Sequence, residues 1–266
     1  TPMKVALSST TLRSLSPGEL VDAAERLGYQ AVEIWSELLW ASGEGPAALG
    51  KAVREKNLAL SVHGPSRDLN VTSINAGIRR KSRAQYLRSL EDAARMEAGI
   101  VNLHPGAFSS SHDRAEDFIP EMRAYADEIA GEAERLGVRA VLEVMEARPG
   151  EYVTDIPTAA EIAREVDRPG FGITVDLAHL LYSGLPAETK GFEPCIAHIH
   201  LSGSTRQRVH VPLAEGIHDL GPPLREIGKF FTGIAAIESY APGREMESAQ
   251  ENLEAFGRLI EDGVRG

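Results

Sequence analysis

The sequence is poor in the residues that build disulfides and thiolate metal sites, since Cys195 is its only cysteine among 266 residues. A single cysteine excludes an internal disulfide and a cysteine-based zinc cage, and it fits a cytoplasmic protein. Cys195 stands at the start of an apolar run, which favours a buried small apolar side chain over a nucleophile.

Long apolar runs are also missing. No run reaches the roughly 18 residues that a membrane helix needs. Residues 1–10 contain one lysine and no long apolar stretch, which is unlike a secretory signal. We therefore expect no membrane partner.

Positive charge is scarce as well, because 28 Lys and Arg residues stand against 39 Asp and Glu residues, a formal net charge of −11. A surface of this charge repels phosphate backbones, so a nucleic-acid partner is not expected. The most basic stretch, residues 78–83, is more typical of a solvated helix face than of a phosphate site. The sequence leaves homo-oligomerisation open.

The remaining composition is that of a folded protein, with 42% hydrophobic and 25% charged residues. These fractions support a sizeable core and argue against disorder. The length suits one α/β barrel of roughly 250 residues, and no linker interrupts the chain. We predict a single domain over residues 1–266.

Short apolar runs alternate with longer segments of helical period along the chain. Gly28, Gly99 and Gly137 each follow a helical segment, as helix C-caps do. The predicted strands are 5–8, 31–35, 59–63, 100–104, 140–144, 172–176, 197–201 and 234–238. The clearest predicted helices are 17–27, 47–56, 79–97, 119–136, 158–166, 221–230 and 247–261.

Eight such strand–helix units, each of roughly 33 residues, predict a closed (β/α)8 TIM barrel within the α/β class. An open doubly wound sheet would need a glycine-rich turn after its first strand, and the turn here, SSTTLRSLSPG, lacks the G-x-G-x-x-G pattern. In a TIM barrel the active site lies at the C-terminal ends of the strands.

Histidines and carboxylates gather at these predicted strand ends, which converge on one face of a barrel. Imidazole and carboxylate ligands without thiolates suit Zn, Mn, Co, Fe or Mg, whereas buried like charges without a cation would repel one another. We therefore predict a divalent metal site at the barrel mouth. The strand-end residues are His63, His104, Glu143, Asp176, His200 and Glu238.

The segments around these residues resemble the successive strand-end motifs of the xylose isomerase-like TIM barrels, over nearly the whole chain. That superfamily includes sugar isomerases and epimerases, inosose dehydratases and endonuclease IV. The resemblance implies a metal-dependent barrel enzyme but does not select one reaction. The segments are SVHGPSRDLNVTS, IVNLHPG, VLEV, VDLAH, HIHLSG and IESY.

Similarity to the epimerase branch implies one divalent metal and a substrate site beside it. The resemblance gives substrate-binding roles to His179, three residues after Asp176, and to Arg206, six residues after His200. The metal ligands that it implies are Glu143, Asp176, His200 and Glu238.

Similarity to the endonuclease IV branch implies two or three zinc ions. His63 and His104 would join Glu143 at one ion, while His179 and His210 would serve a third. The chain departs from that branch in three ways: Arg208 stands where the third ion has an aspartate, HLSG replaces HLND, and the first strand lacks GxHxS.

Several other residues near these motifs have competing interpretations. His200 lies nearer the barrel mouth than His198, so His200 is the predicted ligand and His198 is expected in the core. His112 and His218 are expected on loop surfaces. Glu33 is a candidate to orient His63 or another ligand from behind.

The aromatic residues after the second predicted strand are also ambiguous. Trp35 is a candidate to wall the pocket and stack on a sugar ring, or it packs between barrel and helix. Trp40 is likewise a candidate to wall the pocket and stack on a sugar ring. His63 and His104 are candidates to bind metal or to hydrogen-bond a sugar or phosphate.

Our first hypothesis is a metal-dependent isomerase or epimerase of a small polyhydroxy carbonyl compound. Glu143 and Glu238 would move a proton at the carbon between a carbonyl and a hydroxyl. The alternative is an endonuclease IV-like zinc phosphodiesterase for abasic-site DNA, and a third candidate is a sugar-binding barrel without activity. A dehydratase shares the early steps of the first hypothesis. The predicted substrate contacts are His179, Arg206, His63, His104 and Trp35.

Overall fold

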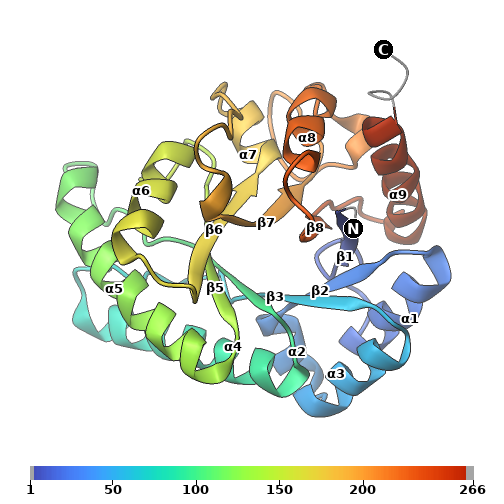
Figure 1. The fold of residues 1–266 in the computed structure, drawn as a ribbon, viewed down its shortest axis with the longest axis horizontal. Helices are drawn as coiled ribbons and strands as arrows, with labels where there is room; N and C mark the ends of the chain where they lie inside the picture. Colours follow the sequence, from blue (N-terminus) through green and yellow to red (C-terminus); the bar gives the residue numbers. More distant parts are fainter. Residues whose placement is uncertain (1–2, 262–266) are drawn as a thin grey trace.

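A computed structural model describes residues 3–261, and the ends of the predicted domain, residues 1–2 and 262–266, lie outside it. Within the described residues, eight parallel strands form a closed barrel in sequence order, with β1 paired to β8. Helices surround the strands (Figure 1). This is the predicted TIM barrel. The strands are β1 (Lys4–Ser8), β2 (Ala31–Trp35), β3 (Ala59–His63), β4 (Ile100–Leu103), β5 (Arg139–Glu143), β6 (Phe171–Asp176), β7 (Ile196–Leu201) and β8 (Ile234–Ile237).

The helices include two short ones that the sequence pattern does not reveal, α2 and α7, because six or seven residues are too few to display a helical period. The α-helices are α1 (Pro17–Leu27), α2 (Ser36–Ser42), α3 (Pro46–Glu55), α4 (Ala76–Met96), α5 (Ala115–Leu136), α6 (Ile156–Val166), α7 (Leu177–Tyr182), α8 (Gly221–Gly228) and α9 (Glu245–Glu261). Short 3-10 turns lie at η1 (Glu193–Cys195) and η2 (Leu213–Glu215).

Helix ends follow local signals at most of the expected places. Ser16 and Glu19 form a reciprocal capping box at the start of α1. Gly28 and Gly137 end α1 and α5 in the left-handed conformation, as predicted. The prediction for Gly99 was wrong, because α4 ends two residues earlier with Glu97 at φ 59°.

Three strands, β4, β5 and β8, end one residue earlier than predicted. His104 and Glu238 directly follow β4 and β8 instead of closing them. Pro105 has no backbone N–H to extend the β4 ladder. The backbone N–H of Glu238 still donates to the carbonyl of Leu201 (2.8 Å), so this residue stays at the barrel mouth.

The inside of the barrel changes character along the strands. Small apolar side chains fill one end, including Ala6, Ala31 and Ala236. Further along the strands lie buried polar side chains, and the histidines and carboxylates come at the C-terminal ends. The larger apolar core packs the outer barrel wall against the helices. No helix within residues 3–261 is both long and apolar enough to cross a membrane.

Candidate active site and metal centre

The register of the barrel brings the four predicted metal ligands together. Asp176 is the direct strand partner of His200, and Glu143 and Glu238 come from the ends of the strands on either side. Nδ1 of His200 lies 3.3 Å from Oε1 of Glu143 and 3.3 Å from Oε2 of Glu238. One ligand atom from each of the four residues lies within 4.8 Å of the others, and all four side chains are buried.

The electrostatics of this cluster suit a cation. Burial alone would raise the pKa of the Glu143 carboxyl, but His200 and His104 hold that pKa well below its usual range. Burial alone would lower the pKa of His200, yet Glu238, Glu33 and Glu143 raise it well above its ordinary value. Oδ2 of Asp176 is buried without a hydrogen-bond partner in the described chain. A divalent ion would satisfy this oxygen and balance the carboxylates, so the residues fit a metal.

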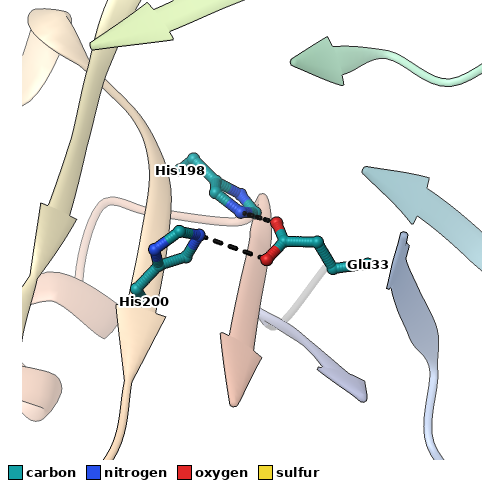
Figure 2. Close-up of side chains that lie close together, drawn as sticks. All are labelled: Glu33, His198 and His200. Atoms are coloured by element: carbon teal, nitrogen blue, oxygen red, sulfur yellow. Dashed lines mark hydrogen bonds and ion pairs between the residues drawn. The ribbon is translucent and has the colours of Figure 1, made fainter. Parts of the chain in front are cut away.

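Glu33 holds the opposite side of the His200 ring. Its Oε1 lies 3.3 Å from Nε2 of His200, and its Oε2 lies 2.6 Å from Nε2 of His198 (Figure 2). Ser61 donates a further hydrogen bond to Oε2 (3.0 Å). Of the two predicted alternatives, His63 or another ligand, Glu33 contacts the candidate ligand His200. His198 is fully buried, as expected.

Glu143 is anchored from below by a chain of buried polar side chains. Nδ2 of Asn102 donates to Oε2 of Glu143 (2.5 Å), and the hydroxyl of Thr174 donates to Oδ1 of Asn102 (2.6 Å). These two bonds fix the carboxylate orientation, which leaves Oε1 toward His200.

His63 and His104 approach the same carboxylate from the β3 and β4 side. Nε2 of His104 lies 3.1 Å from Oε2 of Glu143, and Nε2 of His63 lies 3.6 Å from it. Nδ1 of His63 donates to the carbonyl of Gly64 (2.7 Å), which turns Nε2 toward Glu143. Burial alone would lower the pKa of His63, but the nearby Glu143 and Glu238 raise it to about 9.

His179 and His210 face each other at the other side of the site, with 3.2 Å between their Nε2 atoms. Nδ1 of His179 donates to the carbonyl of Val144 (3.0 Å), and Nδ1 of His210 lies 3.1 Å from the carbonyl of Glu238. Burial alone would lower the pKa of His179, but Asp176 and Glu143 raise it to about 9.

A cavity of about 220 Å³ opens above these residues. Trp35 lines it, and its Nε1 donates to Oε1 of Glu238 (3.2 Å). This contact supports the pocket-wall interpretation. Trp40 instead donates to Asp92 (2.9 Å) and does not line the cavity. The predicted site residues that line the cavity are Trp35, His63, His104, Glu143, His179, His210 and Glu238.

Arg206 is exposed and is not among the residues that line the cavity. Other residues, which were not singled out from the sequence, line the cavity. Their positions depend on how the loops after the strands fold, and the sequence indicates them only by their place directly after a strand. The additional polar and aromatic lining residues are Thr10, Arg13, Glu146, Arg148, Ser239 and Tyr240.

The remaining candidates lie away from the cavity. His112 is exposed, whereas His218 is half-buried. In the basic stretch, Arg79 and Arg83 pair with Glu121 on the neighbouring helix α5, so these charges are already compensated. Cys195 is half-buried and packs against the core.

The chain is similar in sequence to proteins of known function. It is 22% identical over 234 residues to D-psicose 3-epimerase of Agrobacterium fabrum (strain C58), and the match covers 84% of this chain and 79% of that protein. Residues 21–259 match the model of the xylose isomerase-like TIM barrel family.

The fold is shared by solved structures of other proteins, among them two that match nearly the whole of this chain. A D-tagatose 3-epimerase-like protein superposes with a TM-score of 0.84 at 21% identity, covering 98% of this chain and 100% of its own. The IOLI protein with a binding zinc atom gives a TM-score of 0.83 at 18% identity, covering 98% and 99%. With the family model spanning so much of the sequence, the chain belongs to the xylose isomerase-like TIM barrel family.

Proposed function

We propose that this protein is a divalent-metal-dependent isomerase or epimerase of small sugar-like polyhydroxy carbonyl compounds. The observation that carries the proposal is the convergence of Glu143, Asp176, His200 and Glu238 in one buried cluster, of which Glu143 and Glu238 line a small cavity. The similarity to a D-psicose 3-epimerase supports the same class of substrate.

A divalent cation held by these four residues supplies, when bound, polarisation of a carbonyl and its neighbouring hydroxyl. Polarisation of this kind makes the hydrogen on the carbon between them more acidic. The donor set of three carboxylates and one imidazole admits Zn, Mn, Co, Fe or Mg.

Glu143 and Glu238 are the proton-transfer groups of the proposal. They come from β5 and the end of β8, and they contact the same nitrogen of His200 from different strands. Both carboxylates also line the cavity, where a substrate carbon would lie between them. One carboxylate removes the proton, and either the other or the same one returns it. Return to the opposite face inverts the carbon. Return to the neighbouring carbon, with transfer of the hydroxyl proton to the former carbonyl oxygen, moves the carbonyl and gives an isomer.

The other lining residues would hold the substrate. His63, His104 and His179 line the cavity, and their imidazoles would hydrogen-bond hydroxyl groups of the substrate. Trp35 offers a flat apolar face beside His63, with 4.6 Å between the ring centroids. The side chains of His63 and His179 are buried, and the low local dielectric strengthens their polar contacts.

The direct test follows the proton. Ketoses would be incubated with metal-loaded protein in D2O, and exchange at the carbon next to the carbonyl would be measured by NMR. We expect exchange that Glu143→Gln and Glu238→Gln each reduce by at least about 100-fold. Metal content measured in parallel separates loss of a proton-transfer group from loss of the ion. Absence of exchange with every ketose and aldose would contradict the proposal.

A second candidate function is supported by two further groups of candidate metal ligands. His63, His104 and Glu143 present three ligand atoms within 4.8 Å of one another, and Asp176, His179 and His210 do the same. Clustered ions at these groups would suit zinc-dependent cleavage of abasic-site DNA. The net charge of −11 opposes this alternative.

A further inference from the structure

The two arginines that line the cavity differ in how their charge is balanced. Arg148 lies 2.9 Å from Oε1 of Glu146 and 3.5 Å from Oε1 of Glu151, so two carboxylates neutralise it. Arg13 also lines the cavity, but among the described side chains of residues 3–260 it has no carboxylate within 4 Å. The cavity therefore contains one guanidinium with an uncompensated charge on its wall.

Arg13 is held in place by contacts that leave its outer end free. Its Nε donates to the carbonyl of Thr10 (3.2 Å), and its guanidinium carbon lies 4.5 Å from the centroid of the Tyr240 ring. Neither terminal nitrogen has a hydrogen-bond partner within the described chain. A guanidinium oriented by stacking and presenting two free N–H edges is suited to bind a carboxylate or phosphate.

Other arginines of the strand-end loops share this lack of acidic partners. Arg67, in the loop after β3, lies 5.8 Å from the centroid of the Trp35 ring, and Trp35 lines the cavity. Its neighbour Glu37 accepts a hydrogen bond from the Arg67 backbone rather than from the guanidinium. Arg206 and Arg208, in the loop after β7, are exposed and form no ion pair within residues 3–261.

The mouth thus differs in charge from the floor. The carboxylates of Glu143 and Glu238 line the cavity at the candidate metal ligands, and they would repel an anion there. At the outer wall, Arg13 offers the opposite charge. A ligand that complements both ends carries hydroxyl and carbonyl groups at one end and a negative charge at the other.

We propose that the substrate is an anionic polyhydroxy carbonyl compound, a phosphate ester or a carboxylate, whose charged end is bound by Arg13. This inference rests on the proposed function, because it assigns the substrate class of the same cavity. The volume of about 220 Å³ fits a small molecule. A DNA phosphodiester would meet the same arginines, but the net charge of −11 opposes a polymer of phosphates.

The first experiment measures binding without turnover. Sorbitol, sorbitol 6-phosphate and gluconate would be titrated calorimetrically into metal-loaded protein. We expect an anionic ligand to bind at least about tenfold more tightly than sorbitol, and Arg13→Gln to remove about 10- to 100-fold of that affinity, as for one charge-assisted hydrogen bond. Arg13→Lys should keep part of it, since the charge remains.

The matched control is Arg80→Gln, because Arg80 is exposed on α4 and does not line the cavity. This variant should bind all three ligands like the wild type. The loss of affinity in Arg13→Gln, compared between sorbitol 6-phosphate and gluconate, decides between phosphate and carboxylate. A carboxylate that bound only the metal would keep its affinity in Arg13→Gln. Equal affinity for sorbitol and both anions, or an Arg13→Gln variant that keeps the wild-type ratio, would overturn the inference.

The second experiment uses turnover to separate this inference from the proposed function. The ratio of kcat/KM for fructose 6-phosphate to that for fructose should fall at least about tenfold in Arg13→Gln, mostly through KM. Arg13-dependent anion binding without any proton exchange would defeat the proposed function alone. Exchange of neutral sugars without Arg13-dependent anion binding would defeat this inference alone. Arg13-dependent cleavage of an abasic-site oligonucleotide would also overturn it.

Discussion

The carboxylate of Glu33 lies 3.3 Å from Nε2 of His200, the ring nitrogen on the other side from the one that contacts Glu143 and Glu238. A carboxylate in this place favours a proton on Nε2, which leaves the lone pair of Nδ1 toward the three other ligands. His198 and Ser61 hold Glu33 in turn. The orientation of a candidate metal ligand is thus set from inside the barrel.

Glu33→Gln should weaken metal binding by about 10- to 100-fold, because an amide can present its NH2 group to Nε2 and favour the wrong tautomer. Competition with a chromophoric chelator would give the affinity, and the visible spectrum of the cobalt-loaded protein would report the ligand geometry. Glu44→Gln is the matched control, since Glu44 accepts a hydrogen bond from Gly18 in α1 and does not line the cavity. Wild-type affinity and spectrum in Glu33→Gln would contradict this role.

Replacement of a direct ligand should have a larger effect. Asp176→Asn and Glu238→Gln each remove one negative oxygen ligand, so we expect both proteins to lose tightly bound metal under conditions where the wild type retains about one equivalent. Elemental analysis after dialysis gives the stoichiometry. His112→Ala, an exposed histidine in a loop, serves as control. Unchanged metal content in both variants would rule out the four-residue site.

Metal stoichiometry also distinguishes the two candidate functions. The double variant His63→Ala/His104→Ala should keep about one metal ion and lose turnover of a sugar substrate, because these histidines then contact substrate rather than a second ion. The wild type should not cleave abasic-site DNA at low salt, where electrostatic attraction is strongest. Robust cleavage that disappears together with one metal equivalent in the double variant would favour the phosphodiesterase.

The stability of the metal-free protein should fall as the pH rises from about 6.5 through about 9. The pKa values of His63 and His179 are raised to about 9 in the folded protein. A raised histidine pKa contributes its full stability below the unfolded value of about 6.5, and this contribution disappears above the folded value. We expect a loss of about 1 to 3 kcal/mol per histidine.

Denaturant unfolding of chelator-treated protein between pH 6 and 9.5 would measure this dependence. His63→Gln should flatten the curve, since glutamine does not titrate. Metal affinity should change in the opposite direction and increase with pH, because a cation displaces the protons of its ligands. A pH-independent unfolding free energy would contradict the assignment.

Close packing between α3 and α4 gives a prediction about stability. A Cβ atom on Gly50 would lie 2.2 Å from the backbone carbonyl oxygen of Met96, so Gly50→Ala should destabilise the protein by about 1 to 3 kcal/mol. Gly131 lies within α5 with nothing within 4 Å of such an atom, so Gly131→Ala should stabilise by about 0.5 to 1 kcal/mol. Thermal melts of both variants test this, and equal shifts would contradict it.

Much of this protein follows from local sequence signals. Strand runs, helical periods and the capping glycines depend on neighbouring residues. They predicted the barrel with errors of one to four residues at element ends and a wrong cap at Gly99. Because parallel strand ends converge in a closed barrel, the titratable residues at these ends had to meet at one mouth. The convergence of Glu143, Asp176, His200 and Glu238 was therefore predictable from the sequence.

Tertiary structure alone decided the contacts between distant parts of the barrel. Glu33 on β2 reaches His198 and His200 on β7 across the interior, and these strands are not neighbours in the sheet. Such a contact depends on the register and closure of all eight strands, which no local pattern encodes. The same reason explains why Arg13 lines the cavity and Arg206 does not: loop residues take their positions from the loops around them, not from their spacing after a strand.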